Sequence, residues 1–522
     1  MSTFRFIPAF AWVAFCLSVL MPAAKADVKL PSIFSDHMVL QRGMKVPVWG
    51  MAAADEKVTV AFKGQIKTTT ADKEGKWRIQ LDPLEAGGPE QITISGTNSV
   101  TIRDVLIGDV WVGSGQSNMA GGTGGYARRD EELAKLKAAA PYPKLRLFKS
   151  GGRNVKWMTA EAKSINGFSA LLFSFGSALQ KELDVPVGLM VGAVGGTPSG
   201  YWLSMEAIEA DGPCQEAIKA YVAKHSVEVL KKRYDKAVAK WEKAAAKAKE
   251  AGKRAPRKPR PFQTPGDLSN RRIGNLYRRF IRPLIPYGIK GVLWDQGESG
   301  TRVMELDQYT IMGALIKGWR NEWGQGEFPF LYIQKPSGGG VAWDKEANKT
   351  TRMADKFAGL PKGQTKDGNY RELHIRIMAY PNTAMVTCID LGPGIHPINK
   401  SGYGARACQV ALGHVYEKKV AIYGPIYGSH KIEGNKIRIN FNHVGQGLAF
   451  KYGDKLQGFA IAGEDKVFHW AESVIDGNDV IVSSVKVAAP VAVRFGWARR
   501  RAWANLFNKD GLPALSFRTD SW

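Results

Sequence analysis

Cysteine is scarce in this chain of 522 residues, which contains only four. Cys16 lies in an apolar stretch near the start, and Cys214, Cys388 and Cys408 do not have the spacing of metal ligands. A disulfide framework is therefore excluded, and we predict neither a metal site nor a cofactor. Two states stay open for the remaining thiols: a bridge between Cys388 and Cys408, or three buried free cysteines.

Long apolar runs are also missing. Residues 7–20 form an apolar stretch of about 14 residues, which is too short to span a bilayer comfortably. This stretch follows Arg5 and precedes Ala24-Lys25-Ala26, a pattern typical of a cleaved secretory signal over residues 1–26. We therefore predict export to the periplasm or the extracellular space, with no membrane anchor after cleavage.

Acidic residues are few relative to basic ones, 48 against 73, which gives a formal net charge of +25. Residues 231–260 alternate lysine with alanine and carry about ten of these charges. Such a field favours acidic polymers or anionic glycans as partners. No nucleic-acid recognition fold or aromatic platform accompanies the basic run, so we predict no nucleic-acid partner. A solvated helix with a basic tail explains the run equally simply.

The length suggests about three domains, and 44% hydrophobic with 23% charged residues is typical of a globular protein. Short alternating strands over residues 27–104 predict a β-sandwich, and short strands return over 417–522. Between them, residues 105–416 alternate strands with helices, which indicates an α/β domain with a parallel sheet. A basic, mostly helical insertion at about 205–270 interrupts this domain, and no internal repeat is present.

Three polar motifs each follow a candidate strand of the central domain. The first is Gly115-Gln116-Ser117-Asn118-Met119, the second contains Glu298, and the third contains Asp390 and His396. Active sites of open parallel sheets form beyond the carboxyl ends of the strands, so these side chains are expected to meet. The chain order serine, acid, histidine is one of those that build a catalytic triad.

The segment Gly113–Met119 resembles the first signature block of the SGNH hydrolases and, more narrowly, that of the sialate O-acetylesterase family of carbohydrate esterases. The resemblance extends along the chain, through residues 30–42, 46–50, 187–197, 276–285, 432–436, 458–465 and 517–522. It implies an α/β, flavodoxin-like SGNH hydrolase domain flanked by N-terminal and C-terminal β-sandwich-like domains. It also implies a carboxylic-ester hydrolase that removes O-acetyl groups from a sugar or glycan.

The resemblance assigns Ser117 as the nucleophile that forms an acetyl-enzyme. His396, within the matching block His396-Pro397-Ile398-Asn399-Lys400, is then the base that takes the serine proton.

The triad acid is where this chain departs from the family pattern. An aspartate two or three residues before the histidine is usual, and Pro393 and Gly394 stand there. Glu298 is favoured, because related esterases use the glutamate of the same Gln-Gly-Glu block, and Asp390 is the alternative. A serine–histidine dyad without an acid stays open as well.

Donors for the developing oxyanion are expected, by the same resemblance, in the backbone amides of Ser117 and of Gly195 or Gly196, and in the side chain of Gln296. Trp202 and Trp294 could stack on a sugar ring or belong to the core.

The residues expected near the substrate differ more from the family pattern than the catalytic motifs do. Asp295, Gly300 and His374 replace residues that the family usually shows near the substrate. O-acetylated sialic acid is the leading substrate, and acetylated acidic or sulfated polysaccharides fit the basic charge too. The alternatives are a catalytically impaired glycan-binding protein on the same scaffold and a polyanion-binding surface protein that uses residues 231–260.

Overall fold

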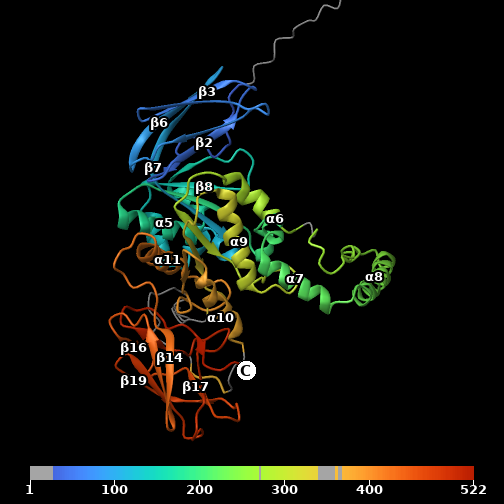
Figure 1. Cartoon of the computed structure of the whole chain (residues 1–522), viewed down its shortest axis with the longest axis vertical. Coiled ribbons are helices and arrows are strands. Elements are labelled where there is room, and N and C mark those ends of the chain that lie inside the picture. Colours follow the sequence, from blue (N-terminus) through green and yellow to red (C-terminus); the bar gives the residue numbers. More distant parts are fainter. Residues whose placement is uncertain (1–26, 270–271, 339–358, 363–366) are drawn as a thin grey trace, which may run out of the picture.

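The structure is a computed structural model of the whole chain. It describes residues 27–269, 272–338, 359–362 and 367–522. The predicted signal segment, residues 1–26, lies outside this part. Within these ranges no helix combines the length and the apolar character needed to cross a bilayer. Figure 1 shows N-terminal strands at one end, an α/β unit in the middle and C-terminal strands at the other end.

The N-terminal strands alternate buried and exposed residues, as half-buried strands do. Strand β3 pairs antiparallel with β4 and β6, β6 pairs with β7, and β2 pairs with β5. The strands are β1 (Val39–Gln41), β2 (Val46–Met51), β3 (Lys57–Phe62), β4 (Gln65–Thr70), β5 (Lys76–Leu81), β6 (Gly87–Ser95) and β7 (Ser99–Gly115).

Strand β7 belongs to two units at once. Its first half pairs with β1 and β6, and its second half lies in the middle of the central sheet. The strand therefore runs through the boundary that the sequence predicts near residue 104. Its last eleven residues are all buried, which accounts for the continuous apolar character of this run.

The central sheet has the order β13-β12-β11-β7-β10-β8-β9, and every pair is parallel except β8–β9. This confirms the predicted α/β class with a mostly parallel sheet. The chain leaves β7 for β8 and β10 on one side and then crosses to β11 on the other, so β7 marks a topological switch point. The remaining strands are β8 (Tyr142–Lys149), β9 (Met158–Ala160), β10 (Val187–Ala193), β11 (Gly291–Asp295), β12 (Phe330–Ile333) and β13 (Thr383–Val386).

Successive residues of the central strands enter different cores. Trp111 and Leu293 face the core that contains α5 and α11, whereas their neighbours Val112 and Trp294 face the core that contains α9. The longer helices begin at side-chain caps, with Ser169 before α5, Asp307 before α9 and Asn399 before α11.

The helices are α1 (Ser117–Ala120), α2 (Thr123–Tyr126), α3 (Glu131–Ala138), α4 (Ala162–Asn166), α5 (Ala170–Leu183), α6 (Met205–Glu209), α7 (Gly212–Lys224), α8 (Val227–Glu250), α9 (Gln308–Trp323), α10 (Asn369–Arg376) and α11 (Lys400–His414). Shorter helical turns are η1 (Ser199–Tyr201), η2 (Tyr277–Ile281), η3 (Arg282–Leu284) and η4 (Ile377–Ala379).

Within the predicted insertion, α8 buries none of its residues and projects away from the central unit in Figure 1. The rings of Tyr234 and Phe262 lie 5.8 Å apart, so the chain leaves and returns at nearly the same place.

The C-terminal strands form a core of their own. They pair in two four-stranded sheets, β14-β15-β20-β19 and β18-β17-β21-β23, and in the short pair β16-β22. Their bounds are β14 (Ile426–Glu433), β15 (Lys436–Asn442), β16 (Leu448–Phe450), β17 (Phe459–Ala462), β18 (His469–Trp470), β19 (Glu472–Asp476), β20 (Asp479–Ser483), β21 (Ala492–Phe495), β22 (Leu506–Asn508) and β23 (Phe517–Arg518). The sandwich character predicted for the flanking units stays a prediction.

Candidate active site

Ser117 lies in the turn that follows β7. Gly115 ends this strand with a φ of +125°, and a Cβ atom there would lie 2.1 Å from the carbonyl oxygen of Asp295 on β11. Both facts require glycine at this position. The amide of Gln116 then donates to the same Asp295 carbonyl at 2.8 Å, and Ser117 begins α1. The turn therefore holds the Ser117 hydroxyl at the edge of the sheet, half-buried.

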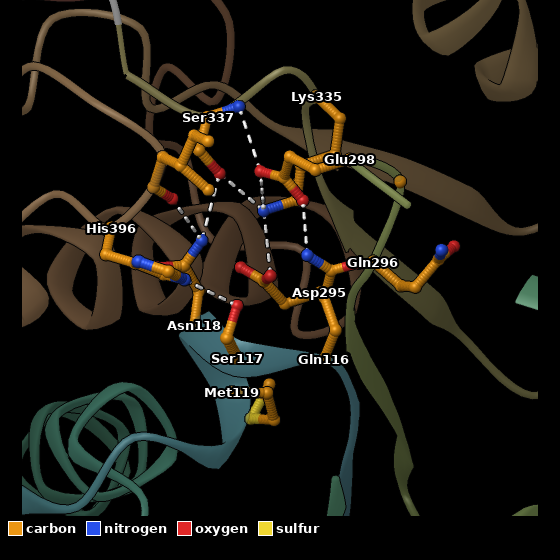
Figure 2. A network of polar contacts seen from close by, with 12 residues as sticks. Gln116, Ser117, Asn118, Met119, Asp295, Gln296, Glu298, Lys335, Ser337 and His396 are labelled. Carbon is orange, nitrogen blue, oxygen red and sulfur yellow. Dashed lines mark hydrogen bonds and ion pairs between the residues drawn. The ribbon is translucent and has the colours of Figure 1, made fainter. Parts of the chain in front are cut away.

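His396 reaches this hydroxyl from the loop between β13 and α11. Its Nε2 atom lies 2.8 Å from Oγ of Ser117, although the two residues are 279 positions apart in the sequence. Figure 2 shows the imidazole directed at the serine, with the rest of the ring exposed. This distance is a normal hydrogen bond and suits proton transfer between the two groups.

The loop that carries His396 is fixed on both sides of the histidine. Asn118 Nδ2 donates to the carbonyl of Ile395 at 3.0 Å. Lys400 Nζ donates to the carbonyl of Pro397 at 2.5 Å and to Asn118 Oδ1 at 2.8 Å. The residue after the serine therefore clamps the residues that flank the histidine. The motif marked Asn118 and Lys400 only as neighbours of the reacting groups, and the structure adds this positioning contact.

Lys400 is fully buried at the start of α11. Burial lowers the pKa of its ammonium to about 7, an effect that Asp295 opposes and Lys335 adds to. The rings of Tyr126 and Tyr403 lie 4.6 and 4.9 Å from Nζ and stabilise its charged form.

Replacing Asn118 with alanine is expected to lower kcat by about 10- to 100-fold, because it removes hydrogen bonds that orient His396. Steady-state kinetics on an aryl acetate measure the effect, with KM changing little. Asn369→Ala, an exposed position on α10, is the matched control. An Asn118→Ala enzyme as fast as wild type would show that the clamp does not position the histidine.

Glu298, the favoured acid, does not contact His396. Its Oε2 atom accepts a hydrogen bond from Gln116 Nε2 at 2.9 Å. Its Oε1 atom accepts one from the amide of Ser337 at 3.1 Å and lies 3.1 Å from Lys335 Nζ. The carboxylate therefore supports the serine turn through Gln116, as Figure 2 shows, and the structure corrects the prediction that it orients the imidazole.

Asp390, the alternative acid, is also engaged elsewhere. Arg406 on α11 binds it through two parallel contacts of 2.9 and 3.0 Å. A bidentate pair of this kind fixes both carboxylate oxygens. Among the residues that the structure describes, no carboxylate bonds to Nδ1 of His396, so the observed geometry is that of a serine–histidine pair.

A buried charge cluster centred on Lys335 lies beside the serine turn. Its Nζ atom lies 2.7 Å from Asp295 Oδ1, 3.1 Å from Glu298 Oε1 and 2.6 Å from Ser337 Oγ. Lys335 follows the end of β12 just as the other site residues follow their strands. The rule about strand ends could therefore have identified it from the sequence.

The cluster sets the protonation of its members. Burial alone would raise the pKa of Glu298, but Lys335 and the Ser337 hydrogen bond outweigh it and lower this pKa to about 2. Burial raises the pKa of Asp295 although Lys335 opposes the shift. Burial would lower the pKa of Lys335, and the two carboxylates raise it instead. The cation is therefore shared by two buried acids.

Gly195 lies beside Ser117 in the loop after β10. A Cβ atom on Gly195 would lie 3.5 Å from Cβ of Ser117, which is van der Waals contact. Gly195 and Gly196 are both exposed, and in the described ranges neither amide donates to a protein acceptor. These amides lie where an oxyanion bound at Ser117 could use them, and their role stays a prediction.

Gln296 cannot be the third oxyanion donor in this geometry. Its Nε2 atom donates to the carbonyls of Thr197 and Gly300, both at 3.1 Å, and its Oε1 atom accepts from Gln308 at 3.2 Å. The side chain is fully buried with both hydrogens used. It therefore ties the loop after β10 to the loop after β11, which corrects the prediction of direct substrate contact.

Trp202 and Trp294 belong to the core. Their exposed fractions are 0% and 1%, and their rings meet edge to face at 6.0 Å. The indole nitrogen of Trp202 donates to Thr197 Oγ1 at 3.1 Å. Neither ring has a free face for a sugar, so the prediction of stacking is wrong and the core alternative holds.

The cysteines Cys214, Cys388 and Cys408 are buried and free, as one of the two open alternatives stated. In the described part of the chain, no group of three or more histidine, cysteine or acidic side chains is arranged to hold a metal ion.

Comparisons with known proteins agree with this geometry. The family described as carbohydrate esterase, sialic acid-specific acetylesterase, matches residues 107–252. The sialate O-acetylesterase of Rattus norvegicus is 29% identical over 454 residues, which are 76% of this chain and 76% of that protein. The sialate O-acetylesterase of Homo sapiens is 25% identical over 526 residues, 91% of this chain and 88% of that protein.

A solved structure extends the likeness to the whole fold. The crystal structure of a carbohydrate acetylesterase from Xanthomonas citri superposes with a TM-score of 0.74 at 29% identity, and the match covers 95% of this chain and 100% of that one. Fold, site and relatives together define a carboxylic-ester hydrolase. Residues 107–252 match the sialic acid-specific acetylesterase family, and over most of its length the chain is similar to sialate O-acetylesterases.

Proposed function

We propose that this protein is an exported serine esterase that hydrolyses O-acetyl esters of sugars, with O-acetylated sialic acid as the leading substrate. The observation that carries the proposal is the 2.8 Å contact between Ser117 Oγ and His396 Nε2 at the carboxyl edge of the parallel sheet. The relatives named above supply the substrate class. The positive net charge favours an anionic sugar over a neutral one.

The reaction follows from the contact between serine and histidine. His396 takes the proton as Ser117 Oγ attacks the acetyl carbonyl carbon, and the carbonyl oxygen becomes an oxyanion. The amides of Ser117 and Gly195 or Gly196 stabilise this charge. The tetrahedral intermediate expels the sugar alkoxide, which takes the proton from His396, and leaves acetyl-Ser117. Water, deprotonated by His396, then releases acetate and restores the serine.

Among the residues that the structure describes, no carboxylate takes part in this scheme, since Glu298 and Asp390 have other partners. A triad acid orients the histidine and stabilises the imidazolium that forms. Here Asn118 and Lys400 hold the loop that carries His396, so they take over the first of these tasks. Solvent around the exposed His396 ring stabilises the imidazolium.

Acetate release tests the proposal. Wild-type enzyme is assayed on an aryl acetate, on O-acetylated sialic acid and on an O-acetylated neutral sugar. We expect turnover of all three, with the highest kcat/KM on the sialic acid. A higher kcat/KM on the neutral sugar than on the sialic acid would show that another acetylated carbohydrate is the substrate. Absence of acetate from all three would leave the glycan-binding alternative.

A second prediction concerns residues 235–261, called here the basic arm, and tests the polyanion-binding alternative. Replacing residues 235–261 with a short Gly/Ser linker is expected to leave kcat/KM on the aryl acetate within about twofold, because α8 buries no residue in the catalytic unit. Tyr234 and Phe262 are close enough for such a linker to join them. Loss of turnover in a variant with an unchanged melting temperature would assign the arm a part in catalysis.

A further inference from the structure

A pocket of about 480 Å³ opens beside the reacting pair, between the central unit and the C-terminal strands. Ser337 and Ile395 line it from the central unit, and Arg499 and Arg500 line it from the loop after β21. The volume is in the range of small-molecule sites. The pocket therefore has the size for a sugar ring, and its two walls come from separate parts of the chain.

The pocket adjoins the nucleophile through direct contacts. Asn118, the residue after the serine, donates to Ser337 Oγ at 3.1 Å and to the Ile395 carbonyl at 3.0 Å. Glu298, a third lining residue, accepts from Gln116, the residue before the serine. Figure 2 shows Asn118, Ser337 and Glu298 around Ser117. A sugar whose acetyl group is at Ser117 would therefore extend its ring toward this pocket.

Arg499 and Arg500 are presented by a fixed backbone. Arg371, fully buried on α10, donates from Nη2 to the carbonyl of Arg499 at 2.6 Å and from Nε to the carbonyl of Ala498 at 3.2 Å. Both lining arginines are exposed, and no described carboxylate lies within ion-pair distance of either guanidinium. The backbone of this loop is therefore anchored at Ala498 and Arg499, and both guanidinium groups are exposed at the pocket.

The charge balance of the pocket favours an anion. The Glu298 side chain is nearly buried and lies 3.1 Å from Lys335, which it shares with Asp295, so the exposed acid that faces the two arginines is Asp367. Asp367 is exposed and can accept hydrogen bonds from sugar hydroxyls. A guanidinium pairs with a planar carboxylate through two parallel hydrogen bonds, a geometry that a neutral group cannot reproduce.

We propose that Arg499 and Arg500 form a subsite for the carboxylate of an acetylated acidic sugar while its acetyl ester lies at Ser117. This inference rests on the proposed function and adds to it the residues that would bind the carboxylate of the anionic sugar. The C-terminal unit then provides specificity for the charged sugar through the two arginines. The central unit provides Ser117 and His396, which hydrolyse the ester.

The test compares two forms of one sugar, O-acetylated sialic acid and its carboxamide, which lacks the charge. For wild type, kcat/KM for the acid is expected to exceed that for the amide by about tenfold or more, mainly through KM. In the double variant Arg499→Gln/Arg500→Gln, the ratio of kcat/KM for the acid to kcat/KM for the amide is expected to fall close to one. A double variant that keeps the wild-type preference would overturn the subsite, and so would a wild type with no preference.

Two further variants complete the test, one as a matched control and one with an expected effect of opposite sign. Arg78→Gln/Arg103→Gln removes two exposed arginines of the N-terminal strands and is expected to keep the preference. Asp367→Asn removes the opposing charge and is expected to lower KM for the acid. Added salt is expected to reduce the wild-type preference, because the arginines are exposed to solvent.

Binding separates failure of the subsite from failure of the esterase. Calorimetry measures the affinity of Ser117→Ala enzyme for deacetylated sialic acid, with and without the two arginine substitutions. We expect weak binding that the double substitution reduces by about tenfold. If wild type released no acetate while this binding difference held, the proposed reaction would fail and the subsite would stand. Equal binding by both proteins, or no binding by either, would overturn the subsite.

Discussion

Ser117→Ala enzyme is expected to lose at least about 10⁴-fold in kcat on any acetyl ester. The substitution removes the hydroxyl oxygen that lies 2.8 Å from His396 Nε2 and that would carry the acetyl group. The buried surroundings of the turn stay intact, since Gly115 and Gln116 hold it through the backbone. Acetate release over hours at high enzyme concentration measures the residual rate.

The matched control is Ser114→Ala, three residues earlier on β7. Its hydroxyl donates to the carbonyl of Gly192 at 2.8 Å and lies in the sheet, so this variant is expected to keep most of its turnover. Equal rates for Ser117→Ala and wild type would remove Ser117 from the reaction.

Lys335→Met is expected to lower the free energy of unfolding by about 3–5 kcal/mol, the largest stability effect that the structure suggests. Lys335, Asp295 and Glu298 are nearly or fully buried, and the lysine is the cation that both acids share. Without it two buried carboxylates lose their partner. Since Glu298 also holds Gln116 beside the nucleophile, activity should fall together with stability.

Thermal and denaturant melting of the variant beside wild type measures this effect. Lys431→Met, at an exposed position on β14, is the control and should melt like wild type. Combining Lys335→Met with Asp295→Asn and Glu298→Gln removes all three charges and should recover part of the loss. A Lys335→Met protein that melts at the wild-type temperature would contradict the assigned role of the cluster.

The sequence was sufficient to predict the sheet class and the meeting of Ser117 with His396. Both predictions use local signals, namely buried apolar runs and the residues that follow them, and parallel strands bring such residues to one edge. Lys335 obeys the same rule after β12 and was missed because a single lysine has no motif. The C-terminal arginines could not be placed at the site, since they come from another unit of the chain.

The triad acid could not be predicted from the sequence for a different reason. Which carboxylate meets the histidine depends on competing partners, and Arg406 takes Asp390 while Lys335 and Gln116 take Glu298. The resemblance predicted Gln296 as an oxyanion donor and Trp294 was left open between sugar stacking and the core, whereas the structure buries both side chains. Motifs predicted which serine and histidine meet and failed for side chains whose position depends on burial.

The central claim is that acetyl transfer passes through Ser117. Wild-type enzyme is mixed with an aryl acetate, quenched in acid within the first turnovers, digested and examined by mass spectrometry. We expect acetyl on the peptide that contains Ser117, and none on the same peptide from the Ser117→Ala or His396→Ala enzyme. Turnover by wild type with no acetyl on Ser117 at any quench time, even when water attack is slowed at low temperature, would contradict the account.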